Sequence, residues 1–80
     1  MKIGKTEITR GEAERLHESG LFLVDGRGVW QINFSAAQRC YYGQLLIRES
    51  GLTRRGKYKI MDAAGVNNLL DTVILIDIIK

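Results

Sequence analysis

Short runs of β-forming apolar residues at 21–24 and 29–32 flank the glycine-rich segment 25–28. A glycine-rich turn between two such runs is typical of a β-hairpin. A two-residue loop at Gly26 and Arg27 would give the hairpin two opposite faces by period-two alternation. One face carries Leu21, Leu23, Trp30 and Ile32, and the other carries Phe22, Val24, Val29 and Gln31. We expect the first face to pack against the core, because all four of its residues are apolar.

Three further segments have strand-like patterns. Residues 57–61 place Tyr58 and Ile60 on one side, and residues 2–8 form a weaker run. The most apolar segment is 72–79, which is apolar on both faces apart from one aspartate. A strand of that kind is central in a covered sheet or pairs with another subunit. The sequence therefore predicts a homodimer formed through a strand from Val73 to Ile79.

Two segments carry matching start and stop signals of helices. A hydroxyl residue followed three positions later by Glu or Gln, the pattern of a capping box, stands at 9–12 and at 35–38. Both segments end in Glu-Ser-Gly-Leu, at 18–21 and at 49–52. In a Schellman cap, such a glycine is left-handed and the leucine folds back onto the apolar residue five positions earlier. These signals predict helices over residues 10–19 and 36–50. Residues 62–70 predict a shorter helix, with Val66, Leu69 and Leu70 facing inward.

The order of these elements predicts a small α+β domain. The order is β-α-β-β-α-β, followed by the short helix and a last strand. It favours a single-layer, mostly antiparallel sheet of about four to five strands, with two main helices packed on one face. A ferredoxin-like arrangement is the nearest common topology. We expect residues 1–80 to form a single domain, because a chain of this length is too short for two cores.

The composition of the chain indicates the cellular compartment in which we expect the protein. The apolar fraction of 45% and the charged fraction of 26% suit a globular protein. The single cysteine cannot form an internal disulfide, so the sequence is unlike that of a cysteine-rich secreted scaffold. The first residues lack the apolar core of a signal peptide, and no apolar run approaches the ~20 residues of a spanning helix. We therefore expect a cytoplasmic protein without membrane contact.

The net charge of +3 is concentrated in the middle of the chain. Residues 21–60 hold seven Lys and Arg against two acidic residues, whereas residues 61–80 hold one against three. Segment 54–59 has four cations in six residues, which repel one another unless they are solvated or bind an anion. It is either an anion-binding edge or a solvated strand edge that lysine protects from aggregation. The candidate partner-binding residues are Arg54, Arg55, Lys57, Tyr58 and Lys59, extended by Arg48 and Arg39 on the predicted second helix.

Residues that usually carry catalysis or bind metals are sparse. The one histidine, His17, is expected in the last turn of the first helix, and the one cysteine, Cys40, inside the second helix. Each has an ordinary structural role there. No Cys, His or carboxylate cluster has the spacing of a metal site, and the glycines around Arg27 do not form a dinucleotide fingerprint. We expect a non-enzymatic protein with no cofactor and no metal.

Two functions agree with these expectations. The first is a small interaction protein whose basic edge blocks or bridges a protein or nucleoprotein complex. Compact single domains without catalytic groups are typical of phage and mobile-element proteins, many of which are anti-defence inhibitors of host nucleic-acid-handling complexes, so by class analogy we expect such an inhibitor. The alternative is a DNA- or RNA-binding regulatory module, in which the cations of segment 54–59 contact phosphates and Tyr58 stacks on a base.

Overall fold

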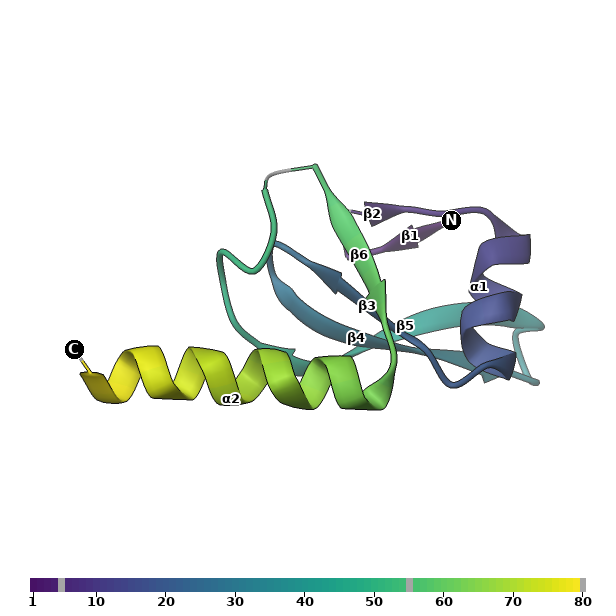
Figure 1. Ribbon diagram of the computed structural model, residues 1–80. Helices are drawn as coiled ribbons and strands as arrows, with labels where there is room; N and C mark the ends of the chain where they lie inside the picture. The colour runs from purple at the N-terminus through teal and green to yellow at the C-terminus, as the bar shows by residue number, and fades with distance from the viewer. Residues whose placement is uncertain (5, 55, 80) are drawn as a thin grey trace.

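The computed structural model of the chain describes the backbone of residues 1–4, 6–54 and 56–79, and the side chains of these residues up to Asp71. It is a small α+β structure with two helices and two antiparallel sheets (Figure 1). In chain order the elements are β1 (Lys2–Ile3), β2 (Thr6–Glu7), α1 (Arg10–Glu18), β3 (Phe22–Asp25), β4 (Gly28–Ser35), β5 (Cys40–Arg48), β6 (Tyr58–Met61) and α2 (Ala63–Ile79).

The main sheet has four strands in the order β5-β4-β3-β6, and β1 and β2 form a separate small hairpin. All pairs are antiparallel. The hairpin of β3 and β4 is confirmed with its two-residue loop, because Asp25 lies opposite Gly28 across Gly26 and Arg27. Two strands are therefore edges of this sheet, β5 on one side and the short β6 on the other.

The two faces of the sheet pack against different parts of the chain. On one face, Leu23 and Ile32 form a buried cluster with Ile3, Ile8, Ala13 and Leu16 of the N-terminal hairpin and α1, flanked by Leu21 and Trp30. On the other face, Val24 and Val29 form a cluster with Val66 of α2, flanked by Phe22, Leu69 and Leu70. The predicted alternation is thus correct. The expected layer of two main helices, over 10–19 and 36–50, on one face is not formed, because residues 40–48 are the strand β5. Instead α1 and α2 contribute to the clusters on opposite faces, since both faces of β3 are apolar and each needs a cover.

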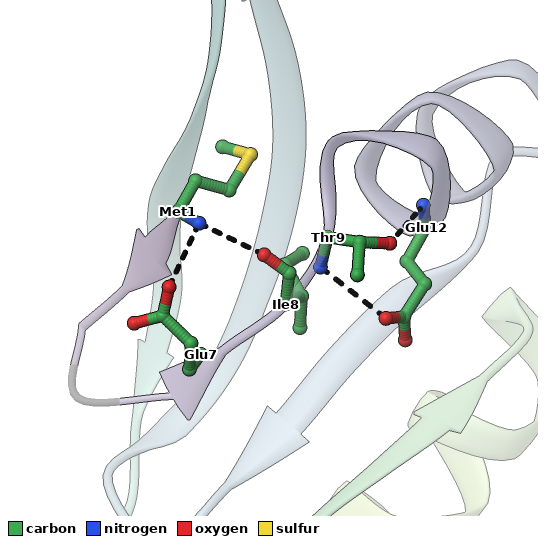
Figure 2. Close-up of polar contacts among 5 residues, drawn as sticks. All are labelled: Met1, Glu7, Ile8, Thr9 and Glu12. Atoms are coloured by element: carbon green, nitrogen blue, oxygen red, sulfur yellow. Dashed lines mark hydrogen bonds and ion pairs between the residues drawn. The ribbon is translucent and has the colours of Figure 1, made fainter.

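Helix α1 has the predicted caps at both ends. Thr9 Oγ1 accepts from the Glu12 amide at 3.1 Å, and Glu12 Oε1 accepts from the Thr9 amide at 3.2 Å, which is the reciprocal capping box (Figure 2). At the other end Gly20 is left-handed, with φ 63°. The Leu21 amide donates to Leu16 O at 2.9 Å, as in a Schellman cap.

The predicted helix over residues 36–50 is wrong. The Gln38 amide does donate to Ser35 Oγ, at 3.3 Å, but this bond belongs to the turn 36–39 between β4 and β5. Arg39, with a left-handed φ of 55°, ends that turn, and β5 follows. Gly51 is left-handed as predicted, yet its amide donates to Gly26 O at 3.1 Å and so holds a loop rather than ending a helix. Without the second helix, the ferredoxin-like topology is wrong as well.

The predicted strand over residues 72–79 is also wrong, because this segment continues α2. The helix begins after Asp62, whose Oδ1 accepts from the Gly65 amide at 2.7 Å in the manner of an N-cap. The expected helix over 62–70 is therefore present and runs on to Ile79. Its last turns lie beyond the sheet in Figure 1. Among the described residues, no helix has the length and apolar content needed to cross a membrane.

Candidate anion-binding surface at one end of the sheet

Four parts of the chain meet at one end of the main sheet. The turn between β3 and β4 lies beside the end of β5, since Gly28 pairs with Arg48. On the other side, Asp25 pairs with Tyr58 at the start of β6. The loop 49–57 connects these two strands. The bond from the Gly51 amide to Gly26 O fixes this loop against the turn.

This convergence gathers cations from separate positions in the sequence. We call them the basic end of the sheet: Arg27, Arg48, Arg54, Lys57 and Lys59. All five side chains are exposed. Among the described residues the one ion pair joins the N-terminal amine to Glu7 Oε1, at 2.9 Å, so none of the five is neutralised by a neighbouring carboxylate (Figure 2).

The other predicted binding residues differ in their positions. Arg55 lies outside the described residues. Arg39 is in the turn between β4 and β5, at the opposite end of the sheet from Arg48. The two residues are nine positions apart along extended chain, roughly 30 Å, so Arg39 is not part of the basic end. The expectation that it extends the patch is wrong because β5 is a strand and not a helix.

A buried carboxylate organises the turn that carries Arg27. Asp25 is 4% exposed. Its Oδ1 accepts from the amides of Arg27 and Gly28 at 2.8 and 3.3 Å and from Trp30 Nε1 at 3.0 Å. Its Oδ2 accepts from Thr6 Oγ1 at 3.0 Å. With four donors the buried carboxylate is fully satisfied, and it joins the β3–β4 turn to the N-terminal hairpin.

Open hollows lie between the cations. One of them, of about 570 Å³, lies between Arg27 and Arg48, with Trp30 and Glu49 in its wall. A second, of about 550 Å³, lies between Arg27 and Lys57, and its wall includes Thr6, Glu7 and Thr53. The walls of these hollows thus combine hydroxyl groups, carboxylates and cations.

Tyr58, the aromatic residue of the predicted segment, is held by α1. Its hydroxyl donates to Glu12 Oε2 at 3.2 Å, and the side chain is 36% exposed. Burial and this hydrogen bond raise the pKa of Tyr58 above its usual 10.0. Hydrogen bonds from the Thr9 amide and hydroxyl and from Tyr58 lower the pKa of Glu12 below 4.5. The ring is therefore fixed in position and its hydroxyl is already engaged.

His17 and Cys40 lie in different environments. His17 Nδ1 is 3.1 Å from Ile32 O, and its ring centroid is 5.8 Å from that of Tyr41. Cys40 is the first residue of β5 and not part of a helix, and its Sγ contacts Gln38 Oε1 at 3.7 Å. In the part of the chain that the structure describes, no three Cys, His or carboxylate side chains form a group that could hold a metal ion.

Sequence reasoning missed two residues of this surface. Arg27 is distant from segment 54–59 in the chain, but the predicted hairpin already placed it in an exposed turn. Asp25 precedes a Gly-Arg-Gly turn, a position at which Asp commonly accepts bonds from the turn amides. A predicted pairing of residues 58–61 with the β3–β4 hairpin would have brought the basic segment beside Asp25 and Arg27, and so would have indicated both residues.

Comparisons with models of protein families, with curated proteins and with solved structures find no match.

Proposed function

We propose that this chain is a small non-enzymatic binding protein that blocks or bridges an acidic protein partner through its basic end. One observation carries the proposal: five exposed cations converge there, and the described residues offer them no ion pair. Uncompensated charge raises the affinity of a surface for a complementary one and speeds association. That the partner belongs to a host defence complex and the protein to a phage or mobile element stays a prediction by class analogy.

The composition of the surface favours a protein partner over nucleic acid. Glu7 and Glu49 stand in the walls of the same hollows as the cations and would repel a continuous phosphate track, whereas an acidic protein partner can place its carboxylates opposite the cations alone. Tyr58 has its hydroxyl bound to Glu12, so it offers a restricted platform for base stacking.

Direct binding of DNA or RNA is the second candidate function. The same unpaired cations support it, because phosphate contacts need exposed Lys and Arg and little else. The two candidate functions differ in two measurable ways. A nucleic-acid-binding protein binds DNA or RNA without any protein partner, and its affinity falls steeply with salt concentration.

The test compares two variants with the same change in net charge. In the first, four cations of the basic end become glutamine: Arg27→Gln, Arg48→Gln, Arg54→Gln and Lys57→Gln. The matched control replaces four cations elsewhere: Lys2→Gln, Arg10→Gln, Arg15→Gln and Arg39→Gln. The probes are a labelled 20-residue polyglutamate and labelled 20-nucleotide single-stranded and duplex DNA and RNA. Fluorescence anisotropy is measured over a series of salt concentrations.

We expect the unaltered protein and the control to bind polyglutamate, and the basic-end variant to bind at least about tenfold more weakly. Equal loss in both variants would refute a localised site. Tighter binding of nucleic acid than of polyglutamate, falling steeply with salt, would establish the second candidate instead. Absence of binding to every probe at low salt would overturn both.

A further inference from the structure

Strand β6 is an open edge beside the basic end. It pairs with β3 on one side, and among the described residues no strand pairs with its other side. Open edges present unpaired backbone groups on which another chain can add a strand. Figure 1 shows β6 running directly from the loop 49–57 into α2.

The pairing register shows which backbone groups are open. A two-residue turn is flanked by the pair whose backbone groups face each other, here Asp25 and Gly28. By alternation, Val24 turns its backbone groups toward β6, where its partner is Lys59. Tyr58 and Ile60 therefore direct their N–H and C=O groups outward, away from β3.

The side chains along this edge differ between the two faces of the sheet. Ile60 is opposite Leu23 and lies on the α1 face, where it is 47% exposed despite being apolar. Lys59 is opposite the buried Val24 and lies on the α2 face, where it is exposed. Lys57, just before the strand, is exposed as well. An added strand would cover Ile60 on one face and meet lysine on the other.

We propose that β6 binds an extended acidic segment of the partner by strand addition. The segment alternates, with apolar residues beside Ile60 and acidic residues beside Lys59 and Lys57. Backbone bonds to Tyr58 and Ile60 give affinity, and the alternation gives specificity. This inference rests on the proposed function, of which it specifies the partner's chemistry and the mode of binding.

Two alternatives to the binding of a partner segment at β6 fit the structure less well. A second copy paired through β6 would bring the lysines of the two strands together, and like charges on paired strands are destabilising. The other edge strand, β5, offers an exposed Leu46, but that residue is the extra one in a register shift between Val29 and Trp30. Bulged edges twist and resist regular pairing.

The experiment uses a labelled eight-residue peptide that alternates glutamate and valine, with capped ends. Two further versions carry N-methyl groups, on every valine amide in one and on every glutamate amide in the other. In an extended peptide these two sets of N–H groups point to opposite edges. Strand addition predicts that one methylated peptide loses affinity by about tenfold or more and the other keeps it. Equal affinities of the two methylated peptides would overturn the inference.

A second arm uses the full chain with one substitution on each edge. Ile60→Ser should weaken binding of the alternating peptide by about threefold or more while leaving polyglutamate binding unchanged. Leu46→Ser is the matched control, since Leu46 is 45% exposed on the opposite edge, and it should change neither. If the alternating peptide fails to bind while polyglutamate still binds at the basic end, strand addition is wrong and the proposed function stands. If neither binds, both are wrong.

Discussion

The carboxylate of Asp25 holds the β3–β4 turn, which carries Arg27, through four hydrogen bonds. Asp25→Ala would leave buried donors without acceptors, and we expect it to lower the free energy of unfolding by about 3 kcal/mol. Asp25→Asn is the matched control. Its amide oxygen can keep the bonds of Oδ1, and its NH₂ can donate to Thr6 Oγ1, so we expect a smaller loss. Urea denaturation followed by Trp30 fluorescence measures both.

If the two substitutions at Asp25 destabilise equally, charge and not hydrogen bonding holds the turn. If neither destabilises, the network is unimportant. Trp30 is the one tryptophan of the chain, and its Nε1 donates to Asp25. A change in Trp30 emission in the folded Asp25→Ala variant, before any denaturant is added, would therefore show that the turn itself has loosened.

Glu12 gives the folded state a predictable response to acid. Its pKa is lowered below 4.5 by bonds from the Thr9 amide and hydroxyl and from Tyr58, so the folded state prefers the charged form. A lowered pKa contributes stability that is present above pH 4.5 and is lost as the pH falls through the folded pKa. We expect Glu12→Gln to reduce the slope of stability against pH below this value. Urea denaturation at several pH values measures this slope, with Glu14→Gln on the same helix as the matched variant that removes one carboxylate from α1 and keeps Glu12.

At the scale of elements, the N-terminal hairpin sits on β5 because Gly43 has no side chain. A Cβ at this position would overlap Ile3 Cγ2 and meet Trp30 Cε3 at 3.3 Å. We expect Gly43→Ala to lower the free energy of unfolding by about 1–3 kcal/mol, because Ile3 is fully buried and cannot move aside freely. Gly11→Ala, on the exposed side of α1, is the matched control and should stabilise slightly. Thermal unfolding of both variants measures these changes. A Gly43→Ala variant as stable as the unaltered protein would contradict the close packing of Gly43 against Ile3.

Local sequence signals predicted α1 and the β3–β4 hairpin correctly, because their caps and turn are closed by residues near in the chain. The same type of signal at Ser35 was misleading. A hydroxyl that accepts from the amide three residues later occurs in a helix cap and in a turn alike, and pairing with β4 decides between them. The run 72–79 is apolar at nearly every position, so its pattern has neither helix nor strand period, and the helix that begins after Asp62 continues through it.

The candidate surface was predictable in part. Segment 54–59 has four cations in its sequence whatever the fold, so the exposure of Arg54, Lys57 and Lys59 could be expected without a structure. Arg48 lies at the end of β5 beside the β3–β4 turn and not on a helix, so its position near the segment has a different origin from the predicted one. Arg27 joins it through strand pairing between distant segments, which composition does not encode.

At the scale of the whole molecule, α2 extends beyond the part of the protein that it covers. Its described contacts with the sheet come from Val66, Leu69 and Leu70, in the first half of the helix. Residues 73–79 contain six apolar residues and one aspartate. A helix that is apolar all round is usually buried, and in Figure 1 no other described helix or strand lies beside these last turns.

We therefore retain the predicted homodimer but expect it to form through α2 rather than through an added strand. Light scattering should show a dimer at high micromolar concentration, and Ile76→Asp should shift the protein toward the monomer by at least about tenfold in dissociation constant, because a charge is costly in an apolar interface. A protein that is monomeric at every concentration would contradict this. Since Ile76 lies on α2 and the proposed contacts lie on β6 and the basic end, Ile76→Asp should keep its affinity for polyglutamate. Loss of both properties together would mean that the basic end binds only as part of a dimer.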